Sequence, residues 1–154
     1  MDILYYWKSI ESDLKSGKVG YFRSDKEKLE TFKAGYPDFI WIVKTPQGRI
    51  KDVQLLAKLA WTDVATKGFI PTSGQSAIHF DPKYPKSGRF ESAASAASID
   101  KTSNWMRRHF PAAVKANFVG SNGQQELRGE VLRELQQITG TWELEPLIPS
   151  APFS

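Results

Sequence analysis

Residues 35–43 read Gly-Tyr-Pro-Asp-Phe-Ile-Trp-Ile-Val, a turn followed at once by an aromatic and β-branched run. Glycine, proline and aspartate favour turns, whereas aromatic and β-branched residues favour a strand. Two further aromatic segments precede this one, over residues 3–7 and 20–23. We expect the three segments to be neighbours, with aromatic rings, the Lys8-Ser9 pair and an arginine at the strand ends. Such a surface suits a flat, electron-rich ligand such as a nucleobase.

The remaining sequence alternates predicted strands and helices, with most strands first and most helices last. Strands are expected over residues 3–7, 19–23, 39–44, 53–61 and 76–81. Helices are expected over residues 9–17, 25–34, 100–109, 111–115 and 122–140, the last one capped by Asn122 and ended by Gly140. The strands at 39–44 and 53–61 are predicted to pair as a hairpin-like unit with a longer connection.

Two segments break this regular pattern. Residues 81–90 are basic and interrupted by two prolines, so they are not expected to supply a central strand. Residues 92–98 are small and low in complexity, and they are predicted to form a loop. The whole layout favours an α+β fold with a small, strongly curved or barrel-like sheet.

The predicted domain organisation has three parts. Residues 1–98 form a ligand-binding core, residues 99–140 an appended helical segment, and residues 141–154 a proline-rich tail or linker. A chain of 154 residues with 40% hydrophobic residues can bury one real core.

Composition excludes several classes of function. The chain has no cysteine, which excludes disulfides, thiolate metal sites and cysteine nucleophiles. Its two histidines make a histidine-rich metal centre an unlikely use of the chain, so we expect no metal and no cofactor. A net charge of +4 permits phosphate contacts without requiring them. We find no signal-peptide pattern and no apolar run of membrane-spanning length, so the expected compartment is the cytoplasm.

A set of short motifs occurs in a recognisable order over residues 5–91. They are Tyr6-Trp7-Lys8-Ser9, Gly20-Tyr21-Phe22-Arg23, Gly35-Tyr36-Pro37-Asp38-Phe39-Ile40-Trp41, Phe80-Asp81-Pro82-Lys83-Tyr84 and Arg89-Phe90. In this order they resemble the EVE branch of the PUA-like superfamily, which is related to the YTH and SRA domains. The resemblance implies a small β-barrel that binds a modified base in an aromatic cage after the base has been extruded from its strand.

The resemblance also implies roles for individual residues. The base-binding set is Trp7, Lys8, Ser9, Tyr21, Phe22, Arg23 and Trp41, in which Tyr21, Trp41 and Trp7 are the cage and Ser9, Lys8 and Arg23 read the polar edge. Independently of the resemblance, basic residues next to aromatic ones are the expected contacts to the nucleic-acid backbone: Lys83, Lys86, Arg89, Arg107 and Arg108. Such a module binds without chemistry of its own.

A second resemblance concerns residues 122–132, Asn-Gly-Gln-Gln-Glu-Leu-Arg-Gly-Glu-Val-Leu. They are similar to the helix that precedes HNH nuclease modules in modification-dependent restriction enzymes. This resemblance favours DNA over RNA and a modified cytosine or adenine as the target. It also implies a nuclease module or partner protein that docks on the C-terminal helix.

Each assignment has a plainer alternative. Trp7 and Trp41 are equally suited to the core of a small barrel, Ser9 to a simple helix cap, and Arg23 to a solvated charge. His79 and Asp81 suggest acid–base chemistry, but without a nucleophile a structural histidine is the better interpretation. For the whole chain, the alternatives are a binder of modified RNA or a small nucleotide-like ligand, and a non-catalytic partner-binding subunit.

Overall fold

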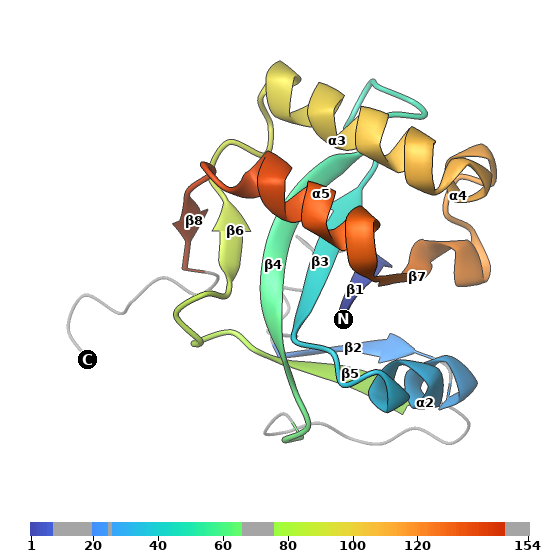
Figure 1. Cartoon of the computed structure of the whole chain (residues 1–154), viewed down its shortest axis with the longest axis vertical. Coiled ribbons are helices and arrows are strands. Elements are labelled where there is room, and N and C mark those ends of the chain that lie inside the picture. Colours follow the sequence, from blue (N-terminus) through green and yellow to red (C-terminus); the bar gives the residue numbers. More distant parts are fainter. Residues whose placement is uncertain (8–19, 25, 66–75, 147–154) are drawn as a thin grey trace.

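The computed structural model describes residues 1–7, 20–24, 26–65 and 76–146 (Figure 1). Its strands are β1 (Asp2–Tyr6), β2 (Tyr21–Ser24), β3 (Phe39–Lys44), β4 (Gln54–Thr62), β5 (Ser76–Asp81), β6 (Gly88–Phe90), β7 (Gln124–Leu127) and β8 (Leu144–Glu145). Its helices are α2 (Lys26–Ala34), α3 (Ala96–His109), α4 (Pro111–Lys115), α5 (Gly129–Thr139) and the short 3-10 helix η1 (Gly120–Gly123). This content confirms the α+β class. The predicted helix over residues 9–17 lies outside the described residues.

The strands form one mixed sheet whose main path runs β2-β5-β4-β3-β1-β7. β1 and β3 pair in parallel, and the other pairs on this path are antiparallel, including the predicted β3–β4 unit. β2 and β7 lie at opposite ends of the path and do not pair with each other, so among the described residues the sheet is open. The predicted barrel is therefore wrong. Closure needs a matching register between strands far apart in the sequence, which local strand propensity does not encode.

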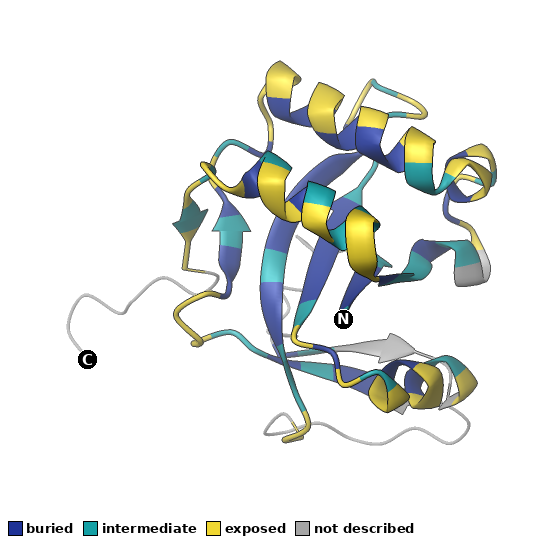
Figure 2. Ribbon diagram, in the orientation of Figure 1, coloured by how far each residue is buried: buried dark blue, intermediate teal, exposed yellow. Residues whose placement is uncertain are grey.

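Helices α3 and α5 lie side by side over β3 and β4, while α2 packs against β5 (Figure 1). Dark, buried residues follow β3, β4 and the inner side of α3, whereas the outward sides of α3 and α5 are exposed (Figure 2). Trp105 is fully buried between the two helices, and its indole Nε1 donates to the Val131 carbonyl oxygen at 3.0 Å. No helix in the described part of the chain is both long enough and apolar enough to cross a bilayer.

The helical half confirms some predictions and corrects others. α3 ends at His109 and α4 begins with Pro111, as predicted. The loop predicted at 92–98 is wrong from residue 96 onward, because Ser95 caps α3 by accepting a hydrogen bond from the Ser98 backbone at 3.2 Å. Small residues with serine at the cap are compatible with a helix start, and the buried face of α3 then selects it.

The single helix predicted over 122–140 is also wrong. Residues 124–127 form β7, which pairs with β1, and only residues 129–139 form α5. Gly129 has a φ of 56°, a conformation that glycine adopts without strain, and it separates the strand from the helix. Leu127 is fully buried beside β1, so tertiary pairing outweighs the helical pattern of the segment.

The expectation that residues 141–154 form only a tail needs correction at its start. Leu144 and Glu145 form β8, which pairs with β6, and β6 in turn pairs with β4. A Cβ at Gly88 would overlap the carbonyl oxygen of Glu145, so glycine permits this close approach. Both prolines of the 81–90 segment lie before β6. The last three residues of the segment, which form β6, therefore pair in the sheet. Residues 147–154 lie outside the described residues.

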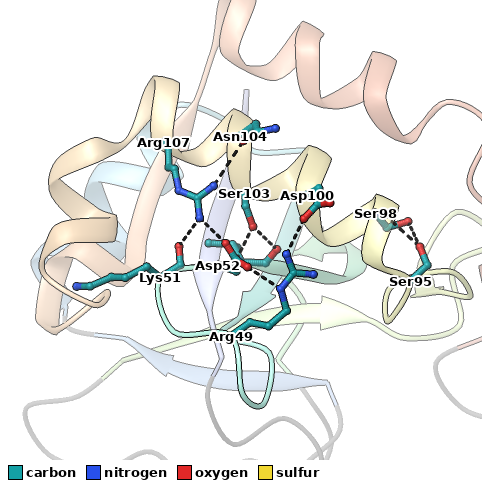
Figure 3. A network of polar contacts seen from close by, with 10 residues as sticks. Arg49, Lys51, Asp52, Ser95, Ser98, Asp100, Ser103, Asn104 and Arg107 are labelled. Carbon is teal, nitrogen blue, oxygen red and sulfur yellow. Dashed lines mark hydrogen bonds and ion pairs between the residues drawn. The ribbon is translucent and has the colours of Figure 1, made fainter.

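A polar network ties the β3–β4 connection to α3 (Figure 3). Asp52 accepts from Arg49 Nε at 2.6 Å and also pairs with Arg107, while Arg49 reaches Asp100 at 2.6 Å. The backbone nitrogen of Val53 donates to Ser103 Oγ at 2.8 Å. Burial alone would raise the pKa of Asp52, but its bonds to Arg107 and Arg49 outweigh burial and hold the pKa below its usual range.

We expect Asp52→Asn to lower the free energy of unfolding at pH 7 by about 1 kcal/mol, because an amide pairs poorly with two guanidinium groups. A carboxylate with a lowered folded-state pKa stabilises the protein above its unfolded pKa of 3.8 and loses that effect as pH falls through the folded value. The difference between variant and wild type should therefore shrink in acid. Urea unfolding at several pH values measures both effects.

Glu130→Gln is the matched control for this prediction. Glu130 also pairs with an arginine, Arg133, but its side chain is 80% exposed. Exposed pairs contribute little, so this variant should unfold like the wild type at every pH. An equal loss of stability in both variants would contradict a special role for Asp52.

Candidate functional site: a charged aromatic cleft

A cleft of about 440 Å³ opens between α5 and the end of the sheet where β3 begins and β4 ends. We call it the β4 cleft, since β4 supplies four of its lining residues, Lys58, Ala60, Trp61 and Thr62. The other lining residues are Asp2, Pro37, Asp38, Phe39, Asp81, Tyr84, Leu132 and Gln136. Its volume falls within the range of about 300–1,000 Å³ that is typical of small-ligand sites.

The register of the sheet explains why these side chains meet. Phe39 is opposite Ala60, and Ala60 is opposite Asp81. In the next row Trp41 is opposite Lys58. Residues directly opposite one another point to the same face of a sheet, as do residues two apart on one strand. The sheet therefore gathers rings, a carboxylate and an ammonium group on the face that α5 covers.

Asp2 is the most buried charged group of the cleft, with 3% of its surface exposed. Its carboxylate accepts from Trp41 Nε1 at 2.7 Å and from the backbone nitrogen of Phe39 at 3.3 Å. Burial raises the pKa of Asp2, and the two hydrogen bonds offset this only in part. Sequence patterns gave no indication of this role for Asp2. No local pattern shows that the indole of Trp41, 39 positions away, will donate a hydrogen bond to its carboxylate.

Lys58 lies beside Asp2 in the cleft and contacts aromatic rings. Its Nζ is 4.2 Å from the centroid of Phe39 and 4.9 Å from that of Trp41, so it makes cation–π contacts with both. Burial lowers the pKa of Lys58, the negative charge of Asp2 opposes this shift, and the positive charge of Lys86 adds to it. Sequence patterns did not single out Lys58, which lies within the strand predicted over residues 53–61.

Three aromatic residues line the walls. The rings of Phe39 and Tyr84 are 6.3 Å apart and tilted by 58°, and 43% of Tyr84 is exposed. Trp61 is half-buried, and its indole Nε1 donates to Asp63 at 3.1 Å. Because Tyr84 and Trp61 are not fully packed, a planar ligand can reach their rings.

The structure places two of the three predicted cage residues in the core. Trp41 is 1% exposed and stacks on Phe90 at 6.1 Å, while Trp7 is 4% exposed and packs edge-on against Phe80. Both positions match the plainer alternative given for these residues. A ring in this environment has no open face on which a base can stack.

Tyr21 is more exposed than the two tryptophans but is not a lining residue of the cleft. It is partly exposed and pairs with His79, which pairs in turn with Thr62 at the cleft wall. Tyr21 is therefore on the same face of the sheet as the cleft, two strands away from β4. Four members of the predicted base-binding set are not described. Lys8 and Ser9 lie outside the described residues, as do the side chains of Phe22 and Arg23.

The residues predicted to contact the nucleic-acid backbone divide into two groups. Lys83 and Lys86 are exposed on the segment that carries Tyr84 to the cleft, and Arg89 is half-buried on β6. Arg107 and Arg108 are instead paired with carboxylates, those of Asp52 and Glu134. The basic residues beside the cleft are thus the lysines, whereas the two arginines of α3 link elements of the fold.

His79 and Asp81 lie two residues apart on β5, so they share a face of the sheet. Burial lowers the pKa of His79, and the charge of Lys33 adds to the effect. A neutral histidine in a half-buried strand agrees with a structural role. Among the described residues no three His, Asp or Glu side chains are grouped so as to hold a metal ion.

The chemistry of the cleft suits an uncharged planar ring with a polar edge. The aromatic walls can stack on the ring, the carboxylates can accept from an amino group, and Lys58 can donate to a ring nitrogen or carbonyl oxygen. No protein family, curated protein or solved structure matches this chain, so the cleft geometry is the basis for proposing a function.

We expect NMR titration of the lysine 13Cε signals to give Lys58 a lower pKa than the exposed lysines. Asp2→Asn should lower the pKa of Lys58 further, because it removes an attractive negative charge. Lys86→Met should raise it, because it removes a repulsive positive charge. Opposite shifts in the two variants test the arrangement, and an unchanged Lys58 signal in both would refute it.

Proposed function

We propose that this chain is a recognition module that holds one planar base, displaced from a nucleic-acid strand, in the β4 cleft. The observation that supports this most directly is the composition of the cleft: accessible aromatic rings, hydrogen-bond acceptors and a donor ammonium group meet in one concavity of base-accommodating size. The module acts by binding, and it needs no cofactor for that purpose.

The position of the exposed lysines supports a ligand with a phosphate backbone. Lys83 and Lys86 flank Tyr84 in one short segment, so contacts to phosphates and to the base would be made by the same piece of chain. Phosphate contacts supply affinity without reading sequence, while the cleft discriminates between bases. This division of roles matches the modified-base reader proposed from the motifs, with a different cage.

Cytosine and adenine suit the cleft best, because each carries an exocyclic amino group that Asp38 or Asp81 can accept from, next to a ring nitrogen that Lys58 can approach. An added methyl group would gain only about 0.8 kcal/mol from burial. Recognition of a modification therefore depends on fit between the walls as well as on hydrophobic gain. We propose DNA as the first strand to test, because the resemblance of residues 122–132 favours DNA. RNA is the necessary comparison, because that segment is divided between β7 and α5 and is not the single helix that the resemblance implied.

We expect Tyr84→Ala and Trp61→Ala each to weaken binding of a modified strand by about 5- to 150-fold, the equivalent of 1–3 kcal/mol per stacked base. Fluorescence-anisotropy titration would use unmodified, cytosine-methylated, hydroxymethylated and adenine-methylated strands at two salt concentrations, in DNA and in RNA. Preference for one modification that both variants lose would support the cage at the β4 cleft.

Two further variants separate the contributions. Lys83→Gln with Lys86→Gln should weaken all strands alike and reduce the slope of affinity against salt by about one per lost phosphate contact. Tyr21→Ala tests the cage predicted from the motifs: loss of preference there, with Tyr84→Ala unchanged, would move the site toward β2. Equal affinity for a free nucleoside and a strand would identify a small-ligand binder, and no binding at all would favour a partner-binding subunit.

A further inference from the structure

We propose that Lys58 is a covalent capture site, at which the ε-amino group forms a reversible imine with an aryl aldehyde held in the β4 cleft. A nucleobase bearing a formyl group is the member of this class that the proposed function would bring to the cleft. The proposal rests on the proposed function for the carrier of the aldehyde, but the reactivity of Lys58 toward a small aldehyde does not depend on that function.

The surroundings of Lys58 differ from those of a surface lysine. Its Nζ lies over the faces of Phe39 and Trp41, on the wall of a cavity of about 440 Å³. Within the described residues Lys58 makes no ion pair, although carboxylates line the same cleft. Its amine therefore contacts ring faces on the cleft wall rather than a counter-ion, and a half-buried amine of this kind can act as a nucleophile toward a ligand bound in the cleft.

The charged and titratable groups around Lys58 come from the sheet side of the cleft, because α5 lines it only with Leu132 and Gln136. They are Asp2 on β1, Asp38 before β3, Asp81 at the end of β5, and Tyr84 and Lys86 on the segment that follows. Burial and the charge of Lys86 lower the pKa of Lys58, so more of the amine is unprotonated near neutral pH than on an exposed lysine. Asp2 limits this shift by its opposite charge.

The reaction is balanced without an oxidant or reductant. The nitrogen lone pair attacks the carbonyl carbon, a proton moves from nitrogen to oxygen, and the resulting carbinolamine loses its hydroxyl group as water. A carboxyl group of the cleft can supply the proton that leaves with that hydroxyl. Overall, an ammonium group and an aldehyde give a protonated imine and water, and the charge stays at the ring faces that already stabilise a cation.

The experiment uses the full chain with 4-hydroxybenzaldehyde and sodium cyanoborohydride at pH 7, followed by peptide mass mapping of every lysine. Cyanoborohydride reduces the imine to a stable secondary amine, so each site of imine formation is recorded. We expect Lys58 to be labelled about tenfold faster than the mean of the exposed lysines, because its lowered pKa leaves more of the amine unprotonated and the cleft holds the aldehyde beside it. Uniform labelling, or slower labelling at Lys58, would overturn the proposal.

Variants supply the matched controls. Lys58→Met should abolish the fast phase, Lys86→Met should slow it without abolishing it, and Lys101→Met, which changes an exposed lysine of α3, should leave it intact. Because the map of the wild-type protein already identifies the reactive lysine, the test does not depend on the folding of Lys58→Met.

A second arm separates this proposal from the proposed function. A DNA strand with one formylcytosine replaces the small aldehyde, and an unmodified strand serves as reference. Selective labelling of Lys58 by the small aldehyde, with no binding of any strand, would leave the capture site standing and remove the nucleic-acid function. Strand binding with no adduct at Lys58 from either aldehyde would remove the capture site and leave the nucleic-acid function standing.

Discussion

The buried carboxylate of Asp2 is the constraint on which the rest of the structure depends. It receives the Trp41 indole N–H and the Phe39 backbone N–H, and the parallel β1–β3 ladder runs on from that point. A buried donor left without an acceptor costs about 1–3 kcal/mol, so the two strands are fixed in this register as long as Asp2 is in place. The same bonds hold Trp41 in the core and anchor the start of β3, where the ring of Phe39 contacts Lys58.

The cleft is built from charges that the fold does not fully neutralise. Asp2 and Lys58 attract each other, yet burial works against the charged form of both, raising the pKa of the acid and lowering that of the amine. A ligand that excludes water would strengthen both tendencies. A buried acid with a raised pKa and a buried amine with a lowered pKa can each exchange a hydrogen bond or a proton with a ligand at little cost. Pairs with pKa values shifted in this way are therefore found in functional sites.

Local sequence patterns account well for the elements whose boundaries are chemically marked. Pro111 and Gly140 define helix ends, and the aromatic runs define β1 and β3. Patterns fail where pairing over long range decides the outcome. Residues 124–127 have a helical pattern but pair with β1, and the strands that the structure describes form an open sheet instead of the predicted barrel.

The same limit applies to the site. The motifs predicted that the aromatic segments over residues 3–7, 20–23 and 35–43 are neighbours. β1 and β3 do pair, but β2 is separated from β3 by β5 and β4, so the prediction is wrong for the segment at 20–23. This strand order depends on long-range pairing, which short motifs do not encode. They could not indicate which rings are open, because Trp41 becomes buried through Asp2, a residue 39 positions away. Lys58 reaches the site through the pairing register of β4, and Tyr84 through the path of the turn after β5. A single sequence specifies neither of these.

That turn couples the two halves of the proposed binding surface. Asp81 accepts from the backbone nitrogen of Lys83 at 2.9 Å, and the Ser87 backbone donates to the Tyr84 carbonyl oxygen at 2.8 Å. Buried Ser87 then accepts from the Ala60 backbone at 2.7 Å, which anchors the segment to β4. The ring of Tyr84 and the two lysines are therefore positioned by one set of bonds. In the proposed function, a phosphate bound by these lysines would contact the same turn that forms the cleft wall, so that contact and the enclosure of the base would be coupled.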